Sequence, residues 1–529
     1  MERRRERERH LRLLGYASPP AMVAAATARR GVGDWRGACA AAAVDTHVDL
    51  RDVAAWYGAD EAARVEDELR ALAPDLLRRF LPRTASLALL PRATVVLSRL
   101  IRPGSRSPGR GDALLVVTLP PTDHHPQRIE LRVTNSRSLR GRWHDLPDWC
   151  WDADAVAARR WAYGASAGRI AWHSPDGRPH PQGGTAAAVS TGDPGTADDR
   201  ARQVETVAAL LAARRPVAAY EAAGLAIDAD ALRQQSAWLL PVLAAHAPAL
   251  PVLAEETRRL AHRYGTATWS SQDGRLAVEV ATDGRLTVRP EGRYVPAAGP
   301  YVFGVPAPAD VALLRWGDLA PDELHPLVHE ALFPERTQAW RAPEPASGPP
   351  MRIRCGRDWH LVQVAAGRLA TMHTDEELRG EFLLAGLGGS IGGCAAAVRA
   401  WRTGAKPVPK EIRKLRRDLF ARAFHGDTDG LLALLADGID PDLRDNRGGT
   451  LMHWLSWVDH QRVLPALVAA GLGLDTPDRE GQTPLHAAAR ALATKVMEVL
   501  IAAGADPDAV DEQGRTAARL LAAVRRETT

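Results

Sequence analysis

The sequence predicts an α+β region of about 400 residues, arranged in two lobes, followed by an all-helical solenoid of repeats. Apolar residues recur at three- and four-residue spacing from Trp35 to about Leu100, which is typical of amphipathic helices. Apolar and polar residues alternate over 276–288, on either side of Asp283-Gly284, which is typical of a β-hairpin. From residue 418 onward, the same markers return every 33 residues, which indicates a helical repeat.

The composition is that of a globular protein. The chain has 529 residues, of which 46% are hydrophobic and 25% charged, and this length allows three or four domains. No stretch of about 18 uncharged apolar residues occurs, and no apolar run follows the charged start MERRRERERH. We therefore expect neither a membrane span nor a secretory signal. Only 4 of the 68 basic residues are Lys, a bias typical of GC-rich coding DNA, which predicts a bacterial protein. The missing secretory signal and four cysteines that lie far apart predict a cytoplasmic one.

Changes in composition divide the chain into six segments. We expect a charged start and helical region over 1–110 with its first 30 residues frayed, a small Trp-rich region with strands over 111–185, a flexible linker over 186–200, an α+β domain over 201–400, a basic connecting segment over 401–417, and the repeats over 418–529. Strands are expected at Ala113–Leu119 and Arg128–Thr134, a small sheet at Arg352–Met372, and two helices around a glycine-rich joint between Asp375 and Trp401.

The repeat markers share one register. The signature residues, in two sets 33 positions apart, are Thr450, His453 and Gly471, then Thr483, Pro484, Leu485, His486 and Gly504. The run from Gly481 to Ala489 resembles the ankyrin repeat, and the resemblance covers about 110 residues from Asp418 to the end. It implies a turn, two antiparallel helices and a protruding loop in each unit, with a degenerate first unit, two full units and a truncated last unit.

The resemblance also assigns roles to these residues. It implies that Thr483 caps the first helix, that His486 ties neighbouring loops by hydrogen bonds, and that Gly504 ends the second helix in a left-handed conformation. Trp454 and Trp457 depart from the family pattern, because they stand where it has small residues. The function implied is protein recognition through the loops and the concave helical face.

Acidic residues gather in the predicted loops, and we expect them to contact the partner. They are Asp440, Asp442, Asp475, Asp478, Asp508 and Asp511. The two runs Asp440, Asp442, Asp445 and Asp506, Asp508, Asp511 have a D-x-D-x-x-D spacing that also suggests calcium, but the Gly and Glu that an EF-hand loop needs are missing. We therefore interpret them as turn residues and not as metal ligands.

Three other patterns have both a functional and a structural interpretation. Gly388-Gly389-Ser390-Ile391-Gly392 matches the G-x-S-x-G elbow of hydrolases, but no strand precedes it, so we expect a joint between helices. His325 and His329 lie four apart without a zinc-protease motif, so we expect core or surface histidines. Five Trp between 143 and 172 are expected to build a core or an interface between lobes, and not a ligand pocket.

The cysteines and the charge pattern complete the sequence analysis. Cys39, Cys150, Cys355 and Cys394 form no C-x-x-C pair, which argues against a disulfide framework and against a Cys-rich zinc site. Residues 401–417 carry seven basic and one acidic residue, whereas 418–529 carry 11 and 17. We expect this basic segment to dock on the acidic repeats. Binding to nucleic acid or to an acidic lipid surface is the alternative.

The sequence thus predicts a non-enzymatic scaffold that binds another protein through its ankyrin repeats. We expect no catalytic residue, no cofactor, no metal, no membrane contact and no nucleic-acid partner, and the sequence does not define the oligomeric state. The alternative is an enzyme or ligand-binding α+β domain, whose repeats recruit the substrate or a regulator.

Overall fold

The computed structural model of the chain divides into two compact units, which we describe separately. Unit 1 comprises residues 1–119 and 129–343, and unit 2 comprises 120–128 and 344–529. The structure describes residues 2–100, 113–122, 125–135, 139, 143–165, 170–179, 197–246, 250–264, 268–271, 275–290, 301–303, 308–340, 350–365, 368–403, 416, 420–436 and 443–528. None of the helices in these ranges is long and apolar enough to cross a membrane.

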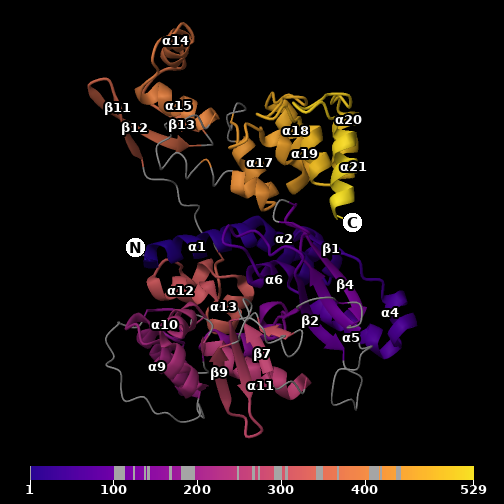
Figure 1. The fold of residues 1–529 in the computed structure, drawn as a ribbon, viewed down its shortest axis with the longest axis vertical. Coiled ribbons are helices and arrows are strands. Elements are labelled where there is room, and N and C mark those ends of the chain that lie inside the picture. Colours follow the sequence, from indigo (N-terminus) through magenta and orange to yellow (C-terminus); the bar gives the residue numbers. More distant parts are fainter. Residues whose placement is uncertain are drawn as a thin grey trace. The chain divides into compact units, whose positions relative to one another are not determined.

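Unit 1 is built on one mixed sheet (Figure 1). Its ten described strands are β1 (Val44–Thr46), β2 (Thr94–Leu100), β3 (Ala113–Thr118), β4 (Ile129–Asn135), β5 (Trp143–Asp145), β6 (Leu225–Ile227), β7 (Thr268–Ser271), β8 (Leu276–Val280), β9 (Leu286–Pro290) and β10 (Tyr301–Phe303). They lie in the order β1-β4-β3-β2-β5-β10-β7-β8-β9-β6.

The two halves of this sheet have the same strand pairing. In the first half, β1 pairs parallel with β4, the strands β2, β3 and β4 are antiparallel neighbours, and β5 pairs parallel with β2. In the second half, β6 pairs parallel with β9, the strands β7, β8 and β9 are antiparallel neighbours, and β10 pairs parallel with β7. The strands β5 and β10 pair with each other and join the halves. Unit 1 therefore contains a duplicated supersecondary structure.

Helices flank the strands of both halves at corresponding positions. α3 (Trp35–Ala41) precedes β1 and α4 (Leu50–Tyr57) follows it, as α9 (Pro216–Ala222) precedes β6 and α10 (Ala229–His246) follows it. The remaining helices of unit 1 are α1 (Glu2–Ala17), α2 (Pro20–Gly31), α5 (Ala59–Ala71), α6 (Pro74–Phe80), α7 (Val156–Ala162), α8 (Ala197–Ala212), α11 (Leu250–Tyr264), α12 (Ala309–Trp316), α13 (Pro326–Leu332) and the 3-10 turns η1 (Asp148–Cys150) and η3 (Pro321–Glu323).

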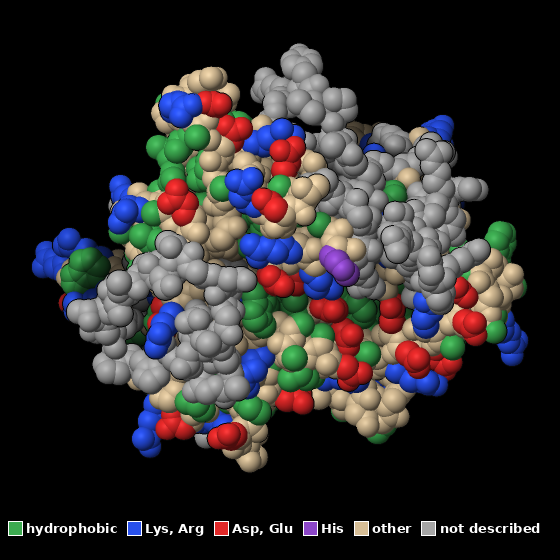
Figure 2. All heavy atoms as spheres, turned by 90° about the horizontal axis from the view of Figure 1, so that it is seen from below, with side chains coloured by type: hydrophobic (Ala, Val, Ile, Leu, Met, Phe, Trp, Pro, Cys, Tyr) green, Lys and Arg blue, Asp and Glu red, His purple; other side chains and the backbone are tan. Residues whose placement is uncertain are grey.

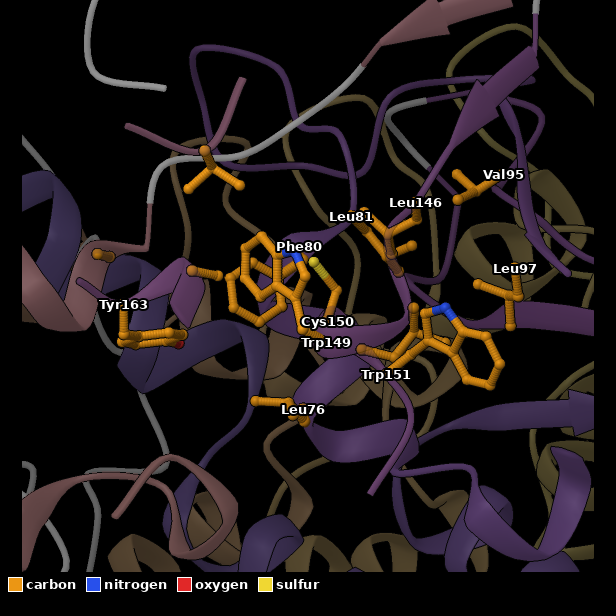
Figure 3. Packing of buried hydrophobic residues seen from close by; sticks show 14 of the residues in the cluster. Leu76, Phe80, Leu81, Val95, Leu97, Leu146, Trp149, Cys150, Trp151 and Tyr163 are labelled. Atoms are coloured by element: carbon orange, nitrogen blue, oxygen red, sulfur yellow. The ribbon is translucent and has the colours of Figure 1, made fainter. Parts of the chain in front are cut away.

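The core of unit 1 forms around aromatic residues that follow the central strand β5. Trp149 is fully buried, with its ring edge-on to Phe80 at 5.1 Å and to Tyr163 at 6.1 Å between ring centroids. Figure 3 shows these rings packed with Leu76 and Cys150, and the same cluster includes Trp151. This packing fits the expectation that the Trp-rich region builds a core.

Unit 1 differs from the sequence-based expectations in two places. The first 30 residues were expected to be frayed, but they form α1 and α2, because Leu14 and Met22 pack into the core of unit 1. The region 1–400 was also expected to form two lobes, but strands from both halves of unit 1 join in one sheet, and unit 1 ends at residue 343. The hairpin of β8 and β9 has its expected turn, with Gly284 at φ +79°.

Unit 2 contains a three-stranded sheet, two helices and the repeats. Its described elements are β11 (Met351–Cys355), β12 (Asp358–Ala365), β13 (Arg368–Ala370), α14 (Asp375–Gly386), α15 (Gly393–Thr403), α17 (Thr428–Ala436), η4 (Leu451–Trp457), α18 (His460–Ala469), α19 (Pro484–Arg490), α20 (Thr494–Ala502) and α21 (Ala517–Thr528). The sheet is antiparallel, in the order β11-β12-β13. The predicted pair of helices around a glycine joint corresponds to α14 and α15.

Candidate functional site

The repeats of unit 2 are linked by two buried histidines at equivalent positions. Nδ1 of His486 accepts a hydrogen bond from the backbone N–H of Thr483, and Nε2 lies 2.8 Å from the carbonyl oxygen of Arg515 in the next loop. His453 makes the same contacts with the N–H of Thr450 and the carbonyl of Gln482, each at 3.0 Å. Each histidine therefore fixes the start of one helix and the loop of the following repeat.

A second periodic feature closes each loop. Oδ1 of Asp478 accepts the backbone N–H groups of Glu480 and Gln482, both at 2.9 Å. Asp445 and Asp511 accept the equivalent N–H groups, two and four residues further on. The glycine three residues after each aspartate, for example Gly481 at φ +72°, has the left-handed conformation that this turn requires.

The loops also pair with one another through backbone groups. The N–H of Arg479 donates to the carbonyl of Arg447, and the N–H of Glu512 donates to the carbonyl of Glu480. Asp475 joins two repeats through its side chain, because its Oδ1 accepts the N–H of Asp506 at 2.9 Å. These bonds hold the loops in one arrangement before any partner binds.

The structure separates the six aspartates that we expected to contact a partner. Asp475 and Asp508 are exposed, Asp478 is half-buried, and Asp440 and Asp442 lie outside the described residues. Asp511 is 4% exposed, and its Oδ2 accepts both Nε and Nη2 of Arg515. Burial disfavours the charged form of Asp511, but its hydrogen bonds with Arg515 and Gln513 lower its pKa. Asp478 and Asp511 thus hold the loops, whereas Asp475 and Asp508 lie on the surface.

An aromatic cluster marks the first two repeats. It consists of Phe420, Phe424, Trp454 and Trp457, with 5.2 Å between the ring centroids of the two Trp residues. Nε1 of Trp454 donates to Oδ2 of Asp445 at 3.0 Å, which ties the ring to the loop. Trp454, Trp457 and Phe424 remain half-buried, so the cluster presents aromatic surface next to the loops.

Stability of the repeats is expected to fall in mild acid because of His453. Burial lowers the pKa of His453 in the folded chain, whereas the unfolded value is about 6.5. The unfolded chain therefore takes up the proton first, so this contribution is complete above about pH 6.5 and is lost as the pH falls toward the lowered pKa. Hydrogen exchange of peptides from 450–490, corrected for intrinsic rates, should show a lower opening free energy at pH 5.5 than at pH 7.5. Equal opening free energies, or the same pH dependence in His453→Gln, would contradict this prediction.

Three other candidate sites came from the sequence: a histidine pair, a glycine-rich segment and a basic segment. His325 is fully buried, with Nε2 at 2.8 Å from Oδ2 of Asp75 and Nδ1 accepting the N–H of Leu327, so neither nitrogen is free for a metal shared with His329. Gly388–Gly392, exposed except for the half-buried Ile391, links α14 to α15, where the hydrolase elbow requires a strand. Of the basic segment, only Trp401, Arg402, Thr403 and Arg416 belong to the described residues.

Sequence analysis missed one group of side chains. Cys355, His360, His373 and Cys394 each offer one ligand atom, and these four atoms all lie within 4.8 Å of one another. The four residues are spaced 5, 13 and 21 positions apart along the chain, so they form no compact sequence motif. The available signals were a Cys-Gly at a hairpin turn, with a His five positions beyond the Cys, and a Gly-Gly-Cys before a helix.

Charges of both signs occur on the surface of the described residues. Figure 2 shows basic and acidic side chains lying side by side over the described part of one face, and the net charge of the chain is only +4. The described part of this face therefore does not show the single-sign patch that is typical of nucleic-acid binding.

Comparison with known families agrees with this geometry. Residues 419–511 match the family model for ankyrin repeats, in three copies. The C-terminal part of the chain therefore contains ankyrin repeats, whereas no family model matches the N-terminal region. A search of curated proteins found no match to the chain. At a coarse level, the repeats imply protein–protein interaction.

Proposed function

We propose that the chain is a non-enzymatic scaffold whose ankyrin repeats bind a protein with a basic surface, through the loops around Asp475 and Asp508. The observation that carries this proposal is the set of bonds between successive loops, including those from His453, His486 and Asp475. Loops that are already ordered lose little conformational entropy on binding, so more of the contact energy appears as affinity.

Charge and composition support a basic protein partner. Residues 418–529 carry 17 acidic and 11 basic residues, a net charge of −6. Exposed carboxylates at the loop tips steer an oppositely charged surface toward the repeats, and this mainly raises the association rate. The half-buried Trp454 and Trp457 beside the loops are of the residue type that most often supplies binding energy at the centre of an interface.

Charge reversal at Asp508 tests this proposal. The exposed Asp508 side chain accepts no hydrogen bond from the described residues, so Asp508→Lys changes charge without removing a structural contact. Partners captured from the native host by the full-length chain would be purified, and their affinity measured by calorimetry at several salt concentrations. We expect Asp508→Lys to weaken binding by about 10-fold at low salt, and by less at high salt.

Glu498→Lys is the matched control, because this substitution changes the charge by the same amount at an exposed position of helix α20, away from the loops. It should leave the affinity within about 2-fold of wild type. An equal loss in both variants, or no loss in either, would contradict docking through the loops.

A further inference from the structure

Four side chains from three neighbouring segments of unit 2 converge on one point. Cys355 ends strand β11 and His360 lies on β12, while His373 precedes α14 and Cys394 is the second residue of α15. Nε2 of His373 lies 3.4 Å from Sγ of Cys355 and 3.1 Å from Nδ1 of His360. Sγ of Cys394 lies 3.6 Å from the same Nδ1 of His360.

Local structure explains this convergence. Cys355 lies two positions beyond Ile353, which pairs with His360, so Cys355 and His360 share one face of the hairpin. Gly393 has φ +54°, and a Cβ there would lie 2.5 Å from Sγ and 2.9 Å from Cα of Cys355. Glycine thus permits the start of α15 to approach the hairpin, which places Cys394 opposite Cys355.

Hydrogen bonds among these four side chains cannot account for all of the close contacts between their sulfur and nitrogen atoms. Each imidazole nitrogen has one proton or one lone pair in the ring plane. Nε2 of His373 nevertheless faces both Cys355 and His360, and Nδ1 of His360 faces both His373 and Cys394. A cation at the centre satisfies all four atoms at once, because each then directs one lone pair inward.

The distances match a tetrahedral ion. With Zn–S near about 2.3 Å and Zn–N near about 2.05 Å, tetrahedral angles separate sulfur from nitrogen by about 3.6 Å and nitrogen from nitrogen by about 3.3 Å. Two of the four sulfur–nitrogen distances are 3.4 and 3.6 Å, the nitrogen–nitrogen distance is 3.1 Å, and all four atoms lie within 4.8 Å of one another. A two-iron cluster would instead hold its Cys and His ligands on different irons, and so further apart. Tetrahedral ligand sets of two thiolates and two imidazoles favour zinc.

We propose that unit 2 holds one structural zinc ion, bound by Sγ of Cys355, Nδ1 of His360, Nε2 of His373 and Sγ of Cys394. Four protein ligands leave no open position for substrate, which is the arrangement of structural and not of catalytic zinc. Glu377 supports the site without binding the metal, because its Oε2 lies 3.5 Å from Nδ1 of His373 and orients the ring.

A zinc ion has a structural task here. Helix α14 buries none of its residues, and the described part of the sheet buries only Met351, Val362 and Leu369. These three side chains share one core with α15 and the repeats, so the sheet contributes little to that core and a bound ion adds a constraint at its edge. Helix α15 begins at the zinc site and ends at the first repeats, where the N–H of Arg444 donates to the carbonyl of Arg402 at 2.7 Å. The zinc ion thereby fixes the helix against which the repeats begin.

Metal analysis of the full-length chain tests this site. Purified protein should contain about one zinc per chain by mass spectrometry, and cobalt exchanged for zinc should give the visible spectrum of tetrahedral cobalt with thiolate charge transfer. Cys355→Ser and Cys394→Ser should lose the metal to a weak chelator, whereas Cys150→Ala, which removes a thiol of unit 1, should retain it. His373→Cys should keep the metal and strengthen the thiolate band, which separates loss of a ligand from loss of folding.

The carboxylate behind His373 gives an independent readout. Glu377→Gln should weaken zinc affinity about 10–100-fold, and Glu376→Gln, the same change at an exposed neighbour, should not. Chelation should also raise hydrogen exchange in 393–403 and 443–449. A chain with far less than one zinc and no cobalt spectrum would overturn the proposal. So would a Cys355–Cys394 disulfide, or a Cys355 that alkylates rapidly in the presence of zinc, as expected of a thiol activated by His373.

Discussion

Asp145→Ala is expected to destabilise unit 1 by about 3–5 kcal/mol, because it leaves a buried guanidinium without its carboxylate. The side chains of Arg99 and Asp145 are only 2% and 5% exposed, and Nη2 of Arg99 lies 2.7 Å from both carboxylate oxygens. Asp145 ends β5, the strand that pairs with both β2 and β10. Asp145→Ala therefore removes this ion pair at the point where the two halves of the sheet meet.

Urea unfolding followed by tryptophan fluorescence measures this effect, since most of the 15 Trp residues lie in unit 1. Asp283→Ala, in the exposed turn of the β8–β9 hairpin, is the control and should change the unfolding free energy by less than about 1 kcal/mol. The double variant Arg99→Met/Asp145→Leu should be less destabilised than Asp145→Ala, because it removes both charges. A loss below about 1 kcal/mol in Asp145→Ala would contradict the account of this pair.

His486→Leu is expected to destabilise the repeats by about 2–4 kcal/mol. His486 is fully buried, and leucine can neither accept the N–H of Thr483 nor donate to the carbonyl of Arg515. Two backbone groups then lose their partners, and the link from one repeat to the next loop is broken.

Hydrogen exchange of peptides covering 483–520 should show this loss, with unit 1 unaffected. His460→Leu, at the start of α18 and half-buried, is the matched control and should leave these peptides protected. Unchanged protection of 483–520 in His486→Leu would show that the repeats are held together by other contacts.

The repeats could be predicted from sequence because their information is local. Thr483, His486 and Gly504 lie within one 33-residue period, and each acts through backbone groups of its own or the next repeat. The structure divides the acidic residues, which the sequence analysis had treated as one set. Asp478 and Asp511 are each followed three positions later by a glycine with positive φ, so D-x-x-G was a turn signal.

The sheet of unit 1 could not be predicted because its pairings are remote and its terminal strands are short. β1 and β6 have three residues each, and β1 pairs with β4 across more than 80 positions of chain. Three residues carry too little periodicity to be recognised as a strand. The duplication is visible only in the order of pairing, which single-sequence patterns do not encode.

The cysteine–histidine cluster was missed for a related reason. A search for C-x-x-C pairs assumes that two ligands share one turn, but each segment here supplies its ligands at wider spacing. Only the register of Ile353 with His360 and the backbone of Gly393 bring Cys355 and Cys394 into one site. Both are properties of the folded chain.

The central claim is that a partner protein binds to the ordered loops of the ankyrin repeats. Hydrogen exchange of the full-length chain, with and without a purified partner at saturating concentration, measures this most directly. We predict that added protection concentrates in 473–482 and 505–515, the loops around Asp475 and Asp508. Protection confined to unit 1, with these loops exchanging as in the free chain, would contradict the claim.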